Sequence, residues 1–199
     1  MIYDSWNIAE NIEVFAEDAI MEESPNEKYD SVIGWISIDG TQINQPIVQG
    51  DDNDYYLRHD YRGNYSIAGS VFLDYRNAKD WSDDFAIIYG HRMTGHLMFG
   101  DIKLFADETF FTEHQKGKIK TGAKIHDFNI LGYIVIDAAD ELYELRAFRN
   151  DENDMILEKL KLRSANWRDD YMNGRVVMLS TCDANSKKYR NVLIGEIID

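Results

Sequence analysis

The stretch Val176-Val177-Met178-Leu179-Ser180-Thr181-Cys182-Asp183 indicates both the fold class of this chain and its chemistry. Its short apolar run is typical of a buried strand. The run ends in Ser180 and Thr181 and then in the only cysteine among 199 residues. A second apolar strand, 191–198, follows, and Arg190 stands at its entrance. We therefore expect two neighbouring strands to hold a thiol and a guanidinium side by side.

A thiol at the end of a strand suits nucleophilic chemistry. Cysteine attacks as the thiolate, so a reactive thiol lies near positive charge and is partly open to solvent. Arg190 supplies that charge, or it stabilises the oxyanion formed when a carbonyl is attacked. The proton donor is expected in His91, which follows the apolar strand 85–90. A structural interpretation stays open, because free cysteine is often buried as a small apolar residue.

Three more segments accompany Leu179-Ser180-Thr181-Cys182 and Arg190. They read DNDYYLRHD at 52–60, GSVFLDYR at 69–76 and YGHRM at 89–93, the last followed by MFGD at 98–101. In this order they resemble the class B sortases, cysteine transpeptidases of Gram-positive bacterial surfaces. The resemblance runs from about Ser31 to the C-terminus, and it departs at Met178, where many members carry threonine.

The resemblance implies a reaction in which Cys182, His91 and Arg190 act together. Cys182 attacks the carbonyl of a threonine in the C-terminal sorting signal of a secreted protein, and a thioester acyl-enzyme forms. His91 protonates the leaving amine and later deprotonates an incoming amine from peptidoglycan or a pilin lysine. Arg190 stabilises the oxyanion. No cofactor and no metal is expected.

The same resemblance implies a groove for the signal peptide. Its matching positions are Asn53, Leu57, Tyr89 and Ser180. Each also has a structural interpretation: Leu57 and Tyr89 as core residues, Asn53 as a turn residue and Ser180 as a backbone cap. Asp183 either orients the catalytic imidazole, as the acidic member of a triad does, or is a solvated turn residue.

Composition limits the partners of this chain. Its length fits one domain with a sizeable core, and 44% of its residues are apolar. The formal net charge is −15, which repels nucleic acids and anionic lipid surfaces. The single cysteine excludes an internal disulfide, and no Gly-rich phosphate loop is present. The histidines lack zinc-site spacing, and the acidic run 51–54 is not a complete calcium loop.

The apolar segments predict a mainly β chain in two parts. Residues 1–30 have apolar positions three and four apart, which predicts a helix or helix pair packed on the barrel. Residues 31–199 are expected to form the catalytic domain, a closed sortase-type β-barrel of about eight strands. Besides the two strands above, the candidates are 32–38, 43–48, 70–73, 85–89, 118–121, 124–137 and 142–147. Helical turns are expected over 98–112, and an inserted helix over 151–162.

The expected location follows from the resemblance. No apolar run approaches the roughly 18 residues that span a bilayer, and no signal peptide opens the sequence. Because sortases of this type are tethered by an N-terminal helix, we expect a single-pass anchor outside this sequence and action on the extracellular face of the membrane. Two other functions stay open, a hydrolytic cysteine peptidase that never transfers to amines and a catalytically inactive surface binding domain.

Overall fold

The computed structural model describes residues 31–93, 95–144, 153–182 and 188–198, so the predicted N-terminal helical segment 1–30 lies outside the described residues. The strands are β1 (Val32–Ile38), β2 (Asn44–Val48), β3 (Val71–Leu73), β4 (Phe85–Tyr89), β5 (Lys116–Thr121), β6 (Lys124–Asp137), β7 (Asn166–Trp167), β8 (Arg175–Cys182) and β9 (Tyr189–Ile198). The helical elements are η2 (Tyr55–Leu57), η3 (Gly100–Ala106), α2 (Glu108–Glu113), η4 (Glu141–Glu144) and α3 (Asn153–Arg163).

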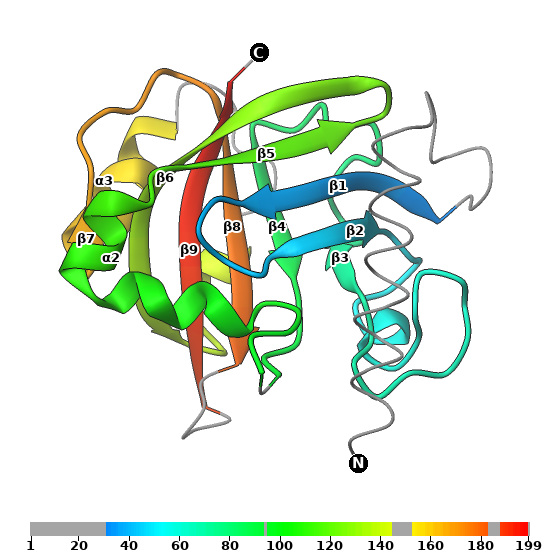
Figure 1. Cartoon of the computed structure of the whole chain (residues 1–199). Helices are drawn as coiled ribbons and strands as arrows, with labels where there is room; N and C mark the ends of the chain where they lie inside the picture. Colours follow the sequence, from blue (N-terminus) through cyan, green and yellow to red (C-terminus); the bar gives the residue numbers. More distant parts are fainter. Residues whose placement is uncertain (1–30, 94, 145–152, 183–187, 199) are drawn as a thin grey trace.

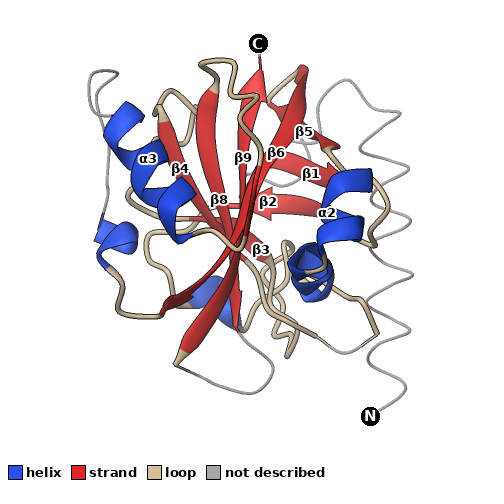
Figure 2. Cartoon of the chain, turned by 90° about the vertical axis from the view of Figure 1, so that its left-hand side faces the viewer, coloured by secondary structure: helices blue, strands red, loops and turns tan. Residues whose placement is uncertain are grey.

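The described strands form one sheet that closes on itself. Their order is β5-β1-β2-β3-β4-β8-β9-β6-β7, and β5 also pairs with β6. That additional pairing completes a ring of eight strands, to which β7 is added by its pairing with β6. The predicted closed barrel of about eight strands is therefore confirmed. Figure 1 shows the barrel, and Figure 2 shows α2 and α3 on opposite sides of it.

Strand β8 is buried on both of its faces, which explains its unbroken apolar run. Successive side chains of a strand point to opposite faces. Val177 and Leu179 belong to the core that also contains residues of β1, β2 and η3. Val176 and Met178 belong to a second core, which includes the buried side chains of α3. The strand is therefore held from both sides up to its last residues.

Two predictions of local structure have different outcomes. The inserted helix is confirmed as α3, which begins at Asn153 in the described residues. The strand predicted over 142–147 is wrong in its described part, where η4 covers 141–144. Leu142 is fully buried in the core that includes α3, so its burial needs no strand.

Three adjacent strands bring the predicted catalytic segments to one end of the barrel. Strand β8 pairs in parallel with β4 and antiparallel with β9. The carboxyl ends of β4 and β8 therefore lie next to the beginning of β9, as Figure 1 allows the reader to follow. Within the described part of the chain, no helix is long and apolar enough to cross a membrane.

Candidate active site

The backbone register brings the three predicted catalytic residues together. Cys182 is the last residue of β8 and lies directly across the ladder from Arg190. In the parallel pair, Tyr89 lies level with Ser180, so His91 and Cys182 each follow the paired position by two residues. Because neighbouring strands are about 4.8 Å apart, the three backbones meet at this end of the barrel.

The ring of His91 is held by a backbone carbonyl. Its Nε2 lies 2.8 Å from the carbonyl oxygen of Leu57, at the end of η2. A carbonyl oxygen only accepts hydrogen bonds, so Nε2 carries the proton of this bond and Nδ1 is left for exchange. The turn itself is fixed by Asp52, whose carboxylate accepts from the backbone N–H groups of Asp54 and Tyr55. The bonds from Tyr55 and Asp54 also lower the pKa of Asp52.

Gly90 permits the close packing that precedes His91. Its N–H donates to the carbonyl of Ser180 at 3.1 Å, which joins the end of β4 to β8. A Cβ at this position would lie 2.7 Å from the ring of Phe99, a fully buried side chain. The N–H of Phe99 in turn donates to the carbonyl of His91 at 3.0 Å. Glycine is therefore required where the chain leaves β4, and the buried ring fixes the course of the histidine segment.

A groove of about 390 Å³ opens beside these residues. All four predicted peptide-binding residues, Asn53, Leu57, Tyr89 and Ser180, line it. The remaining lining residues are Phe72, Gly90, His91, Ala138, Tyr143, Thr181 and Arg190. Residues predicted from three separate segments thus share one cavity with His91 and Arg190.

The structure gives the surroundings of these four residues. Leu57 and Tyr89 are partly exposed in the groove and pack on the edge of the core. The hydroxyl of Ser180 lies 2.7 Å from the phenol oxygen of Tyr143, so it does not act as a backbone cap. Asn53 accepts from the N–H of Tyr75 at 3.0 Å and also faces the groove. Asp183 lies outside the described residues.

Sequence reasoning missed a buried ion pair beneath the groove. Asp74, 2% exposed, follows β3 and receives two parallel bonds from the guanidinium of Arg76. Burial would raise the pKa of Asp74, but hydrogen bonds from Arg76, Asn53 and Tyr89 outweigh it and lower that pKa. The Asp-Tyr-Arg order at 74–76 was the available signal, since it spaces an acid and a base for a local pair. The order of these three residues does not indicate the long-range partners of Asp74, which are Asn53 and Tyr89.

Tyr143, a further groove residue, was also missed. It was assigned to a predicted strand, but it belongs to η4 and lines the groove beside Tyr89. The two rings are stacked, with centroids 6.2 Å apart. Burial first, and then the negative charge of Asp74, raises the pKa of Tyr89 above its usual range. The phenol of Tyr89 therefore stays protonated and acts as a hydrogen-bond donor.

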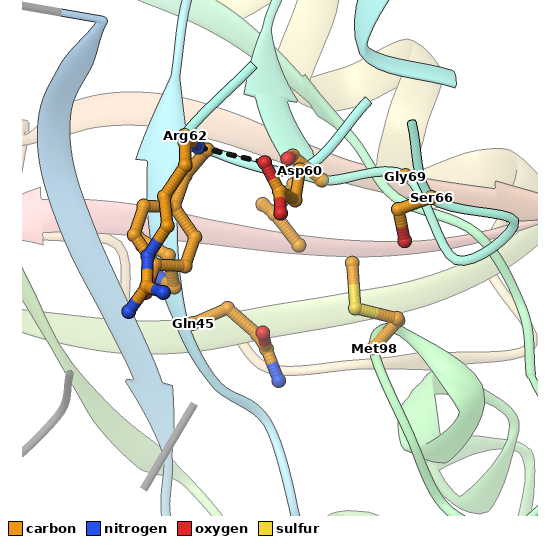
Figure 3. A pocket seen from close by; sticks show the side chains of 10 residues that line it. Gln45, Asp60, Arg62, Ser66, Gly69 and Met98 are labelled. Atoms are coloured by element: carbon orange, nitrogen blue, oxygen red, sulfur yellow. Dashed lines mark hydrogen bonds between the residues drawn. The ribbon is translucent and has the colours of Figure 1, made fainter. Parts of the chain in front are cut away.

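A second, smaller cavity of about 90 Å³ lies elsewhere in the barrel. Gln45, Asp60, Arg62, Ser66 and Met98 are among its lining residues, and Figure 3 shows the backbone N–H of Arg62 donating to Asp60. None of the predicted site residues lines this cavity. Across the described ranges, no cluster of three or more His, Cys, Asp or Glu side chains could hold a metal ion.

Comparison with known proteins gives relatives over most of the chain. No family model matches it. Sortase B of Listeria monocytogenes is 33% identical over 173 residues, which are 84% of this chain and 70% of that protein. The crystal structure of sortase B from Bacillus anthracis matches with a TM-score of 0.87 at 30% identity, covering all of both chains. A Streptococcus pyogenes class B sortase involved in pilus biogenesis matches with a TM-score of 0.77 at 35% identity, covering 85% of this chain and 93% of that one.

These similarities confirm the resemblance seen in the sequence. The match to the Bacillus anthracis structure covers the whole chain, and so includes both the barrel strands and the segments that line the groove. Likeness of fold alone would leave the activity open, because one fold hosts many functions. Here sequence and structure agree over most of both chains, and the chain therefore belongs to the class B sortases, which are cysteine transpeptidases.

Proposed function

We propose that this chain cleaves the C-terminal sorting signal of a secreted protein at a threonine carbonyl and transfers the acyl group to an amine. The observation that carries the proposal is the register of β4, β8 and β9. In that register Cys182 lies opposite Arg190, and Cys182 and His91 each lie two residues beyond the paired positions Ser180 and Tyr89. His91 and Arg190 line a groove of about 390 Å³.

The first half of the reaction forms a thioester. The thiolate of Cys182 attacks the threonine carbonyl carbon, and the electron pair of the C=O bond moves to oxygen. When the tetrahedral intermediate collapses, the C–N bond breaks and the leaving amine takes a proton from His91. The hydrogen bond from Nε2 to the Leu57 carbonyl supports Nδ1 as the nitrogen that gives this proton.

The second half restores the enzyme. An amine from peptidoglycan or from a pilin lysine attacks the thioester carbonyl and loses a proton to Nδ1 of His91. The C–S bond then breaks, which leaves a new amide and the thiolate of Cys182. Water in place of the amine gives hydrolysis instead.

Arg190 is assigned to the developing oxyanion. Its guanidinium has several donors in a fixed plane, so it can hold the oxyanion and a peptide carbonyl at the same time. Loss of one such donor typically costs about 10²–10³ in rate. Because Arg190 also lines the groove, it is within reach of a bound peptide.

The groove fits an extended peptide. Leu57, Phe72 and the rings of Tyr89 and Tyr143 offer apolar walls, and Ser180 offers a hydroxyl. Such a mixture, mostly apolar with a few polar groups, is typical of sites that fix one orientation of a ligand. The substrate is a sorting-signal peptide of a surface protein, and the place of action is the extracellular face of the membrane.

The test is a competition between transfer and hydrolysis. The chain is incubated with threonine-containing sorting-signal peptides, with and without a peptidoglycan-type amine or a pilin lysine peptide, and the products are separated by mass. We expect a ligated amide that replaces the hydrolysis product as the amine concentration rises. Hydrolysis that no amine diverts would instead support a cysteine peptidase. Absence of any cleavage would refute the proposed reaction.

A further inference from the structure

Asp74 accepts hydrogen bonds from three residues, Arg76, Asn53 and Tyr89, of which the last two line the groove. Its Oδ1 accepts from the backbone N–H of Arg76 at 2.9 Å and from the Nε of that residue at 2.8 Å. Its Oδ2 accepts from Arg76 Nη2 at 2.7 Å, from Asn53 Nδ2 at 3.1 Å and from the phenol of Tyr89 at 3.0 Å. A carboxylate that accepts this many bonds is fixed in place and fixes its donors.

The bond to Asp74 sets the orientation of the Asn53 carboxamide. Its oxygen accepts from the N–H of Tyr75 and one of its N–H groups donates to Asp74, so the amide cannot flip without losing both bonds. The other N–H of that amide has no hydrogen-bond partner among the described residues, and Asn53 lines the groove. The amide is therefore held with a donor left for a ligand.

Arg76 extends the same support to Tyr143 and its neighbour Glu144. Its Nη2 donates to the carbonyl of Tyr143 at 2.8 Å, and its Nη1 lies 3.5 Å from the carboxylate of Glu144. Tyr143 then lies against Ser180 through its hydroxyl. One buried ion pair thus connects Asn53, in the turn before η2, with Tyr89 of β4 and Tyr143 of η4, and all three residues line the groove.

We propose that Asp74 and Arg76 are positioning residues, whose ion pair orients Asn53, Tyr89 and Tyr143 to bind the peptide. Neither Asp74 nor Arg76 lines the groove, so both act through other side chains. The inference rests on the proposed function for its substrate, a sorting-signal peptide. The orientation of the Asn53, Tyr89 and Tyr143 side chains, however, is a property of the free enzyme.

The test uses Asp74→Asn, which keeps the size of the side chain and removes its charge. Glu196→Gln is the matched control, because Glu196 is also a fully buried carboxylate bonded to backbone N–H groups, here of Met172 and Gly174. It lies opposite Val176, far from Cys182 on the same strand pair. Arg76→Lys adds a milder variant, since lysine keeps the charge but cannot form the two parallel bonds.

Two readouts decide the proposal. The first is the side-chain amide signal of Asn53 in ¹H–¹⁵N spectra, assigned with Asn53→Ala. Asp74→Asn and Arg76→Lys should shift this signal and speed its hydrogen exchange, whereas Glu196→Gln should not. The second is peptide kinetics with the rate at which iodoacetamide alkylates Cys182. We expect KM to rise at least tenfold, equivalent to about 1.4 kcal/mol, with the alkylation rate within about twofold of wild type.

The outcomes separate this inference from the proposed function. An Asn53 signal unchanged in Asp74→Asn overturns the inference, whatever the enzyme cleaves. A KM that stays at the wild-type value, or an alkylation rate that falls in parallel with cleavage, also overturns it. If the wild-type enzyme cleaves no sorting-signal peptide, the proposed function fails, and the amide signal alone still decides whether the ion pair positions the groove. If Asp74→Asn does not fold, Arg76→Lys gives the same measurements.

Discussion

Replacing Gly90 with alanine tests how tightly the structure fixes the position of His91. The added Cβ would lie 2.7, 2.8 and 3.1 Å from three ring carbons of Phe99. The optimal distance between carbon atoms is about 3.5–4.0 Å, so either the ring or the backbone at 90–91 must move by about 1 Å. Phe99 is fully buried in the barrel core, which leaves the backbone before His91 as the freer of the two.

Both stability and activity should respond to this change. Overpacking of a core typically costs about 1–3 kcal/mol. At about 2–4 °C per kcal/mol for a chain of this size, the Tm should fall by roughly 2–12 °C. A catalytic group displaced by about 1 Å can cost about 10²-fold in rate, so kcat/KM should fall by a similar factor.

The assays are thermal unfolding by circular dichroism and peptide cleavage below the Tm of the variant. Gly95→Ala is the control, because Gly95 lies in the same segment and has nothing within 4 Å of the added carbon. Its φ of +77° makes alanine strained there, so this control should lose stability but keep kcat/KM. A Gly90→Ala variant with wild-type Tm and wild-type kcat/KM would refute the reasoning.

Three further predictions follow from the same site. Arg190→Lys should lose nearly as much kcat/KM as Arg190→Ala, about 10²–10³-fold, because lysine keeps the charge without the planar donors; near-normal turnover of the lysine variant would leave only a role for charge. The rate should follow a bell-shaped pH profile, because the reaction needs the thiolate of Cys182 and a proton on His91 at the same time, and a flat profile from pH 5 to 10 would contradict this. Since the pKa of Asp74 is lowered in the folded state, its stabilising effect is present above about pH 4 and is lost as pH falls through the folded pKa. The difference in unfolding free energy between wild type and Asp74→Asn, measured by denaturant titration, should therefore shrink in acid, and a constant difference would count against the ion pair.

The sequence pattern predicted the strands that carry the site. In these strands the apolar residues and the turn residues that follow them indicate the same strand ends. The bounds expected for β1 and β6 are those observed, and those expected for β4 differ by at most one residue. In each case a run of apolar residues, or an alternation of apolar and polar residues, ends at polar or glycine residues. The local pattern therefore favours the same strand that the folded barrel contains. The parallel register of β4 and β8 could not be read in this way, since it depends on residues that are distant in sequence.

Predictions failed where a side chain bonded to the backbone or where a long-range contact decided the outcome. The carboxylate of Asp140 accepts from the N–H of Leu142 at 3.0 Å and pairs with Arg163 of α3, which favours a helical turn over the predicted strand. Strand β2 contains Pro46 although it pairs on both sides. Pro46 is tolerated there because β3 pairs only with Ile47 and Val48 and so does not reach it.

The part of the candidate site that could be predicted consists of the residues given by the resemblance and of those at the ends of apolar strands. His91, Cys182 and Arg190 each stand at the end or the beginning of an apolar strand, which is a local signal. The partners of Asp74 come from the turn before η2, from β4 and from a residue two positions away, and no periodicity connects them. A buried polar network of this kind becomes visible only when the chain is folded.

The most direct test of the central claim is to trap the acyl-enzyme on Cys182. The chain is mixed with a threonine-containing sorting-signal peptide, quenched in acid and analysed by intact mass and by mapping of the digested protein. We predict an added mass equal to the acyl half of the peptide, located on Cys182, which disappears when an amine is supplied and does not form in Cys182→Ala. Turnover without an adduct, or cleavage by the alanine variant well above background, would contradict the account.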